Sequence, residues 1–190
     1  MKPINGFKEA EPIIGGGTVY TLPSGNYEFF IMDAKLTKSK SSNRDMLQIA
    51  FDVAEGQYAD FYRKKFEADK KRDPSKAVWD YDAYFYQLCD EQALGRFKGF
   101  IKCLEDSNPS FSWDWDESKL RGLRFAGQTR NEQSLGNNGK VYDHNKLVNI
   151  YPVSELENLP KLSDKTVKQE SVDFGGGFGG SVADNSDIPF

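Results

Sequence analysis

The sequence predicts a mainly β domain with one long helix, followed by a polar C-terminal tail. Hydrophobic residues make up 38% and aromatic residues 14% of the 190 residues, which is enough for a core of ordinary size. Alternating apolar and polar positions predict several short strands, and one stretch has the spacing of a helix. The predicted order is three strands, a helix and two strands. This order is typical of the OB-fold, a five-stranded Greek-key barrel that binds oligonucleotides.

The first three strands are predicted before residue 68. They span Asn26–Leu36, Arg44–Ala54 and Gln57–Glu67. In the first two, every second residue is apolar, so that one side of each strand faces a core. The third is expected to place Tyr62, Lys64 and Phe66 on one face, because they recur at every other position. The aromatic stretch Trp79–Leu88 fits either a continuation of the strands or a lead-in to the helix.

The helix is predicted after Asp90, which is a suitable N-cap. The residues at helical spacing on its apolar face are Ala93, Phe97, Phe100, Ile101 and Leu104. Asn108-Pro109 is expected to end this helix. The remaining elements are predicted as a strand around Leu123–Thr129, a hairpin loop over Asn131–Asn145 and a last strand over Lys146–Val153.

Composition divides the chain into three parts. Residues 1–21 are a loose lead-in with a triple glycine, and residues 22–153 form the predicted barrel. Residues 154–190 are polar and contain a glycine-rich run before the C-terminus, so we expect a disordered tail. The tail has seven acidic and three basic side chains, which accounts for the whole net charge of −4. The predicted barrel is therefore neutral.

Two cysteines and one histidine argue against a dedicated metal site or cofactor, and the cysteines flank the predicted helix, too far apart for a disulfide. The chain has no apolar run long enough to cross a membrane and no apolar N-terminal leader. We expect a soluble protein in a reducing cytoplasm.

Cations and aromatic rings alternate in the first half of the predicted barrel. A single nucleic-acid strand is bound by cations that contact its phosphates and by rings that stack on its bases. The candidate DNA-binding residues are Phe30, Lys35, Lys38, Lys40, Arg44, Tyr62, Lys64 and Phe66. The alternative is a solvated, lysine-rich hairpin whose charges only discourage aggregation.

Catalysis has little support in the sequence. His144 lies in a predicted loop without an obvious partner for acid–base chemistry. Asp114, Asp116 and Glu117 form an acidic turn, for which metal binding is the less favoured alternative. Trp113 and Trp115 alternate with these acids, which repel phosphate, so we expect them to pack at the base of the barrel. Tyr84 and Tyr86 fit either packing or base stacking.

The C-terminal tip, Asp187-Ile188-Pro189-Phe190, resembles that of bacterial and phage single-stranded DNA-binding proteins (SSBs). In that family the tip recruits replication and repair enzymes. The resemblance implies that Ile188, Pro189 and Phe190 enter an apolar pocket of a partner, with Asp184 and Asp187 beside its basic residues. Ordinary SSB tips carry more consecutive acids, which implies a weaker affinity here. An acidic tail can also compete for a cationic groove on its own protein.

The predicted barrel also resembles a family of phage replication-module proteins from Gram-positive hosts. The matching stretches are Pro23–Tyr27, Ser39–Asn43 with Met46-Leu47, Phe97–Ile101, Ser107–Pro109 and Trp113–Asp116. Members of this family are generally taken to be SSB-like DNA binders with an OB-fold. The resemblance does not extend to oligomeric state.

Taken together, these features predict a non-catalytic protein that binds and protects single-stranded DNA during phage replication or recombination in the bacterial cytoplasm. The tip is expected to recruit replication or recombination proteins, and a homo-oligomer is left open. A rival hypothesis is a protein-interaction module that mimics the host SSB tail and does not bind DNA. A third is a recombination mediator that anneals complementary strands.

Overall fold

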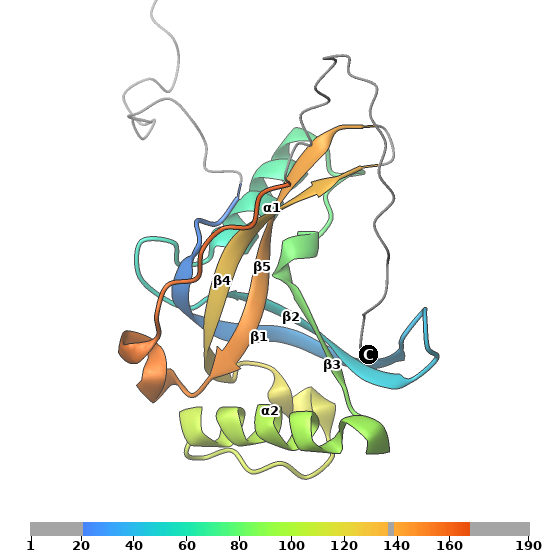
Figure 1. The fold of residues 1–190 in the computed structure, drawn as a ribbon, viewed down its shortest axis with the longest axis vertical. Coiled ribbons are helices and arrows are strands. Elements are labelled where there is room, and N and C mark those ends of the chain that lie inside the picture. Colours follow the sequence, from blue (N-terminus) through green and yellow to red (C-terminus); the bar gives the residue numbers. More distant parts are fainter. Residues whose placement is uncertain (1–20, 137–138, 168–190) are drawn as a thin grey trace, which may run out of the picture.

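The computed structural model describes residues 21–136 and 139–167, which form one sheet with helices around it (Figure 1). Five strands form this sheet: β1 (Gly25–Lys38), β2 (Asp45–Val53), β3 (Tyr84–Leu88), β4 (Arg124–Leu135) and β5 (Val141–Tyr151). All neighbours are antiparallel, in the order β3-β2-β1-β4-β5. The expected mainly β architecture is confirmed.

The central strand, β1, serves both halves of the sheet. Its first residues, Gly25–Phe30, pair with β4, and the stretch Phe29–Lys38 pairs with β2. A bulge between Ile31 and Asp33 shifts the register with β2. Bulges bend a strand and increase its twist. In Figure 1, β4 and β5 accordingly cross steeply over β1 and β2.

The sheet is not closed. In the described part of the chain, β3 and β5 are the two edges and no ladder joins them. A short 3-10 turn at Tyr81–Ala83 spans part of the opening, where Asp82 accepts a hydrogen bond from the backbone N–H of Asn145 on β5 at 2.8 Å. One side chain thus bridges part of the gap between β3 and β5.

Helix α2 (Leu94–Ser107) occupies the position predicted for the helix and covers one end of the sheet (Figure 1). Its buried residues, Phe97, Phe100, Ile101 and Leu104, are those expected from the spacing, and it ends directly before Asn108. Asp90 caps the 3-10 turn that precedes it by accepting a hydrogen bond from the N–H of Ala93 at 3.1 Å. The prediction of this helix is confirmed.

A second helix, α1 (Phe61–Arg72), overturns the predicted third strand at Gln57–Glu67. Helical spacing suits this segment, because Tyr62 is buried and Lys65, Phe66 and Asp69 are half-buried on the same side. The actual third strand is β3, within the aromatic stretch. The predicted hairpin loop, Asn131–Asn145, is too long. The pair of β4 and β5 residues nearest the loop is Leu135 and Val141.

The core lies between the sheet and the helices and is rich in aromatic rings. The centroid of the Phe29 ring lies 5.0 Å from that of Phe51 and 5.6 Å from that of Phe125. The inward residues predicted for β2, Leu47, Ile49, Phe51 and Val53, are all buried, which confirms its register. Edge-to-face and offset rings contribute beyond the area they bury.

The segment after β5 stays on the domain longer than the predicted boundary at residue 154. A 3-10 helix spans Val153–Asn158, and Lys165 then exchanges backbone hydrogen bonds with Asn131 and Gln133 of β4, both at 2.8 Å. Lys165 therefore lies on the same side of β4 as β1, beyond Thr129, where the pairing of β1 with β4 ends. In the described ranges, 21–136 and 139–167, none of the helices has the length and apolarity that a membrane crossing requires.

Candidate nucleic-acid interface

One surface of the sheet combines rings and cations: the side of β1, β2 and β3 that faces away from the core, here called the outer face. Cross-strand pairing builds it in rows, because directly paired residues point to the same side. One row joins Lys35, Gln48 and Tyr86, and the next joins Asp33, Ala50 and Tyr84. The two rows border a recess of about 470 Å³.

Residues outside the three strands also line the recess. Its lining consists of Met32, Asp33, Lys35, Gln48, Ala50, Trp79, Tyr84 and Arg121. Trp79 precedes β3, and Arg121 follows the 3-10 helix Glu117–Leu120. This volume lies in the range of ordinary ligand pockets, about 300–1,000 Å³.

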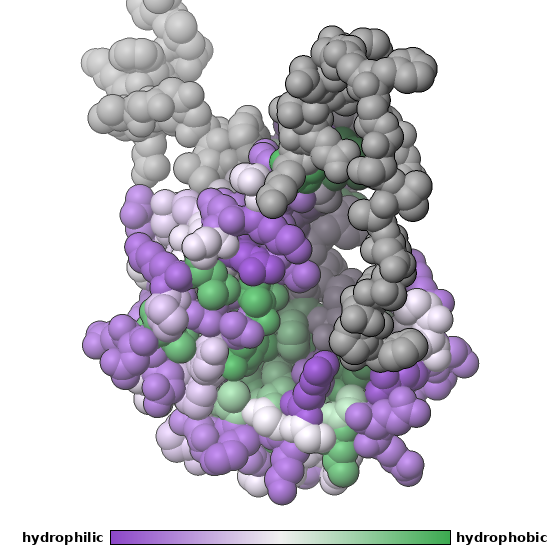
Figure 2. Space-filling model, viewed as in Figure 1, coloured by the Kyte–Doolittle hydropathy of each residue, from purple (hydrophilic) through white to green (hydrophobic). Residues whose placement is uncertain are grey.

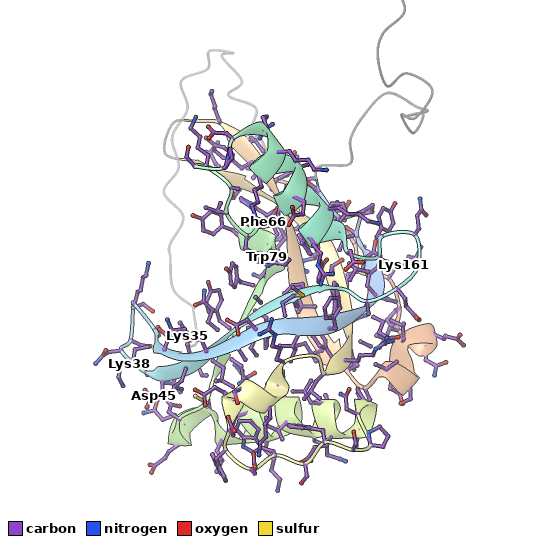
Figure 3. The ribbon with its side chains drawn as sticks, turned by 180° about the vertical axis from the view of Figure 1, so that it is seen from behind. Lys35, Lys38, Asp45, Phe66, Trp79 and Lys161 are labelled. Atoms are coloured by element: carbon purple, nitrogen blue, oxygen red, sulfur yellow. The ribbon has the colours of Figure 1, made fainter. Side chains whose placement is uncertain are left out.

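Aromatic rings lie in and beside the recess. Tyr84 and Tyr86 are stacked with centroids 6.5 Å apart and planes 26° apart, and Tyr86 is 52% exposed. Burial, with smaller effects of Tyr86 and Asp33, raises the pKa of the Tyr84 hydroxyl. That hydroxyl therefore remains a neutral donor at physiological pH. Trp79 contacts Phe66 of α1 with centroids 6.0 Å apart (Figure 3).

The cations of this surface come from β1, from α1 and from the irregular segment before β4. Lys35 of β1 and Arg121 both line the recess. Arg63 of α1 lies with its guanidinium 5.9 Å from the centre of the Phe30 ring, and an ion pair at 3.2 Å links it to Asp60. Both partners of that pair are about half-exposed, so its contribution to stability is small. The arginine can therefore exchange its partner for a phosphate.

The predicted site residues divide between this surface and other places. Lys35 and Phe30 lie on the outer face, and Phe66 packs beside it against Trp79. Lys38 extends from the far end of β1 in an exposed ion pair with Asp45 at 2.7 Å (Figure 3). Lys40 and Lys64 are exposed, on the β1–β2 loop and on α1.

Tyr62 does not reach the surface. It is 2% exposed and packs edge-to-face against Phe51, with centroids 6.0 Å apart. The prediction of a base-stacking Tyr62 depended on a strand in which it shares a face with Lys64. In a helix, two residues at this spacing point in different directions. A base cannot stack on Tyr62 in this structure.

Arg44 is also placed differently from the prediction. Its guanidinium binds the Asp90 carboxylate through two hydrogen bonds, at 2.5 and 2.6 Å. The pKa of Asp90 is lowered and that of Arg44 raised, chiefly by this hydrogen bonding. The charge of Arg44 is thus already neutralised, and its side chain borders a different cavity from Lys35.

Sequence reasoning missed Trp79, Arg121 and Asp33 as members of the site. Trp79 and Arg121 lie in irregular segments, where no periodicity assigns a face. Asp33 would point into the core in a regular strand, and only the bulge turns it outward. The tip residues Asp184, Asp187, Ile188, Pro189 and Phe190 lie outside the described residues.

A second concavity, of about 1,190 Å³, follows the opening between β3 and β5 above α2. Apolar side chains gather on this side of the molecule (Figure 2). Those lining the concavity include Phe85, Phe100, Val148 and Ile150. Its lining also includes Arg44, Arg96 and Asn149, so cations and hydrogen-bonding groups border this concavity as well.

His144 and the acidic turn both make polar contacts within the domain. The imidazole lies between Asp82, with Nδ1 3.4 Å from Oδ1, and the Ser134 hydroxyl, 3.0 Å from Nε2, so it does have polar partners. Asp114 pairs with Lys119, and Asp116 caps the following turn. Within residues 21–136 and 139–167, no three His, Cys, Asp or Glu side chains group as metal ligands do.

The two tryptophans of the acidic turn have different environments. Trp113 and Trp115 both contact Phe97 of α2, with centroids 5.9 and 6.3 Å away. Trp113 is partly buried against the core, which agrees with its predicted packing role. Trp115 is 74% exposed, so the prediction that it packs at the base of the domain is wrong for most of its surface.

A scan against protein-family models and a search among curated proteins both return no match to this chain.

Proposed function

We propose that this protein binds single-stranded DNA on the outer face of β1, β2 and β3. The observation that carries the proposal is the recess that Lys35 and Arg121 share with Tyr84 and Trp79. Cations beside exposed rings are the two requirements for holding a flexible, unpaired strand. The domain is neutral and the tail acidic, so no overall positive field attracts DNA, and a local concentration of cations has to do so.

The fold supports this proposal as an open form of the OB-fold. In that fold the first strand pairs with the second and fourth, and a helix lies between the third and fourth strands. The order β3-β2-β1-β4-β5 and the position of α2 agree with this topology. OB-folds bind oligonucleotides on the face of their second and third strands. The outer face includes those strands.

In the proposed complex, Lys35, Arg121, Arg63 and Lys64 neutralise phosphates. The bases stack on Tyr86, Tyr84 and Trp79, each ring contributing about 1–3 kcal/mol. We further propose that the C-terminal tip recruits replication or recombination proteins, as the resemblance to SSBs implies. No step of this function requires a bond to be made or broken.

A labelled oligo(dT) titration tests the proposal by fluorescence anisotropy. We expect binding at low salt that weakens steeply as salt is added, because each neutralised phosphate releases counterions. Lys35→Gln is expected to lower the salt slope by roughly one ion, whereas Lys98→Gln on α2 leaves it unchanged. Tyr86→Ala is expected to weaken binding roughly fivefold or more, and Trp115→Ala, which removes an exposed ring beside α2, serves as its control.

The absence of oligo(dT) binding by the full chain below about 100 mM salt, where phosphate contacts are strongest, would sink the proposal. The interaction-module hypothesis predicts that outcome. Equal effects of Lys35→Gln and Lys98→Gln would instead place the DNA on another surface.

A further inference from the structure

Asp33 places a carboxylate in the middle of the proposed DNA-binding face. It lines the same recess as Lys35 and Arg121. A carboxylate repels phosphates, so on this face it opposes the binding of a DNA backbone. A role for Asp33 in DNA recognition rests on the proposed function. In such a role, Asp33 contacts a part of the DNA that carries hydrogen-bond donors instead of phosphates.

A β-bulge turns the Asp33 side chain outward. Because of the bulge between Ile31 and Asp33, two consecutive residues, Met32 and Asp33, both line the recess. In a regular strand, one of them would point to the core. After the bulge, Asp33 pairs with Ala50 and Lys35 with Gln48, so both side chains share the outer face. Bulges are frequent where a strand must re-aim a functional side chain.

The recess therefore offers an unusual combination of groups to a base. An ionised carboxylate accepts hydrogen bonds and cannot donate them, and it can accept two in parallel. Lys35, two residues further along the same face, donates hydrogen bonds. Tyr84 and Trp79 supply ring surfaces against which a base can stack.

Among the four bases, guanine matches this combination best. Its Watson–Crick edge presents two adjacent donors, N1–H and the N2 amino group, beside the O6 acceptor. Adenine and cytosine place their amino group beside a ring nitrogen that repels a carboxylate, and thymine flanks N3–H with two carbonyls. We infer that the recess is a guanine-selective subsite, in which Asp33 accepts from N1–H and N2–H. Lys35, which contacts a phosphate when the strand is oligo(dT), donates to O6 when guanine occupies the recess.

The test compares oligo(dT) of about 15 nucleotides, within the reach of one OB-fold, with the same strand carrying one central guanine. A well-formed bidentate contact discriminates between bases by a large factor, so we expect the guanine strand to bind at least about fivefold more tightly. A central inosine, which lacks the N2 amino group, should lose most of that gain. Asp33→Asn should abolish the preference.

Asp106→Asn, which removes a carboxylate from α2, is the matched control and should retain the preference. If Asp33→Asn strengthens the binding of both strands equally, Asp33 acts only by repulsion and the inference is wrong. The inference also fails if the wild-type protein binds both strands with equal affinity. Failure to bind either strand has a different meaning, since it contradicts the proposed function itself.

Discussion

Asp52 shows at the scale of one residue how the sheet organises its surroundings. Its side chain is fully buried on β2 and accepts hydrogen bonds from the backbone N–H groups of Val53, Tyr62 and Arg63, at 2.8, 2.9 and 2.9 Å. Burial raises its pKa, and these three bonds offset part of the rise. Two of the donors belong to the first turn of α1, whose own N-cap, Asp60, makes no capping bond. A strand residue therefore caps this helix.

Asp90 and Asp52 are expected to change the free energy of unfolding in opposite directions as the pH falls. Hydrogen bonding to Arg44 lowers the pKa of Asp90 below its usual 3.8, so the ionised form favours the folded state. This contribution is complete above pH 3.8 and is lost as the pH falls through the lower, folded-state pKa. Asp52 has a raised pKa, so its contribution falls as the pH rises.

Urea unfolding of the wild type and of Asp90→Asn across this pH range isolates the effect, since Asp52 is common to both. The difference in their free energies of unfolding should be largest near neutral pH and should shrink in acid. Asp69→Asn, which removes the ion-pair partner of the exposed Arg72, is the control. A difference that does not change with pH would show that the Arg44–Asp90 pair contributes no charge-dependent stability.

At the scale of elements, close packing between strands limits what the sheet accepts. Gly127 of β4 pairs with Tyr27 of β1 and Ile150 of β5. A methyl group added there would lie 2.6 Å from Leu147 and 2.7 Å from Phe29. Both neighbours are core residues, so neither side chain can move away freely. Glycine is therefore required at this position by packing.

Gly127→Ala is expected to lower the free energy of unfolding by roughly 1–3 kcal/mol, the usual effect of overpacking a core. Gly99→Ala on α2 makes the same chemical change where the added methyl meets open space. It should stabilise the protein by about 0.5–1 kcal/mol through helix propensity. Urea denaturation of both variants measures the contrast. Equal effects of the two substitutions would show that the Gly127 site relaxes around the methyl group.

At the scale of the whole molecule, a neutral domain is joined to an acidic tail. The proposed DNA-binding face therefore depends on a local group of cations, and the tail adds a competing negative charge within the same chain. Its last seven residues, Asp184–Phe190, hold two aspartates.

Deleting Asp184–Phe190 is expected to leave the affinity for oligo(dT) unchanged or to raise it, with the largest gain at low salt, where charge repulsion is least screened. Anisotropy titrations of both forms at several salt concentrations provide the measurement. A loss of DNA binding on deletion would contradict the proposal, because it would place the interaction in the tail.

Local periodicity in the sequence was enough to predict α2, the register of β2 and the mainly β architecture. In those segments a single pattern fits, as with Phe97, Phe100, Ile101 and Leu104 on one helix face. The segment containing Tyr62 and Phe66 fits both a strand and a helix. In the structure it is a helix, and Asp52, ten residues before Tyr62, caps it from β2.

The candidate site depended even more on the tertiary structure. Arg44 and Asp90 are 46 residues apart in sequence, and their ion pair removes Arg44 from the expected DNA-binding group. The bulge in β1 brings Asp33 onto the same face as Lys35. Trp79 and Arg121 also line the recess, and both come from chain segments without periodicity. Sequence alone determined which residue types were available, since composition and spacing are local properties. Only the tertiary structure decided which of them meet, because those contacts join residues far apart in the chain.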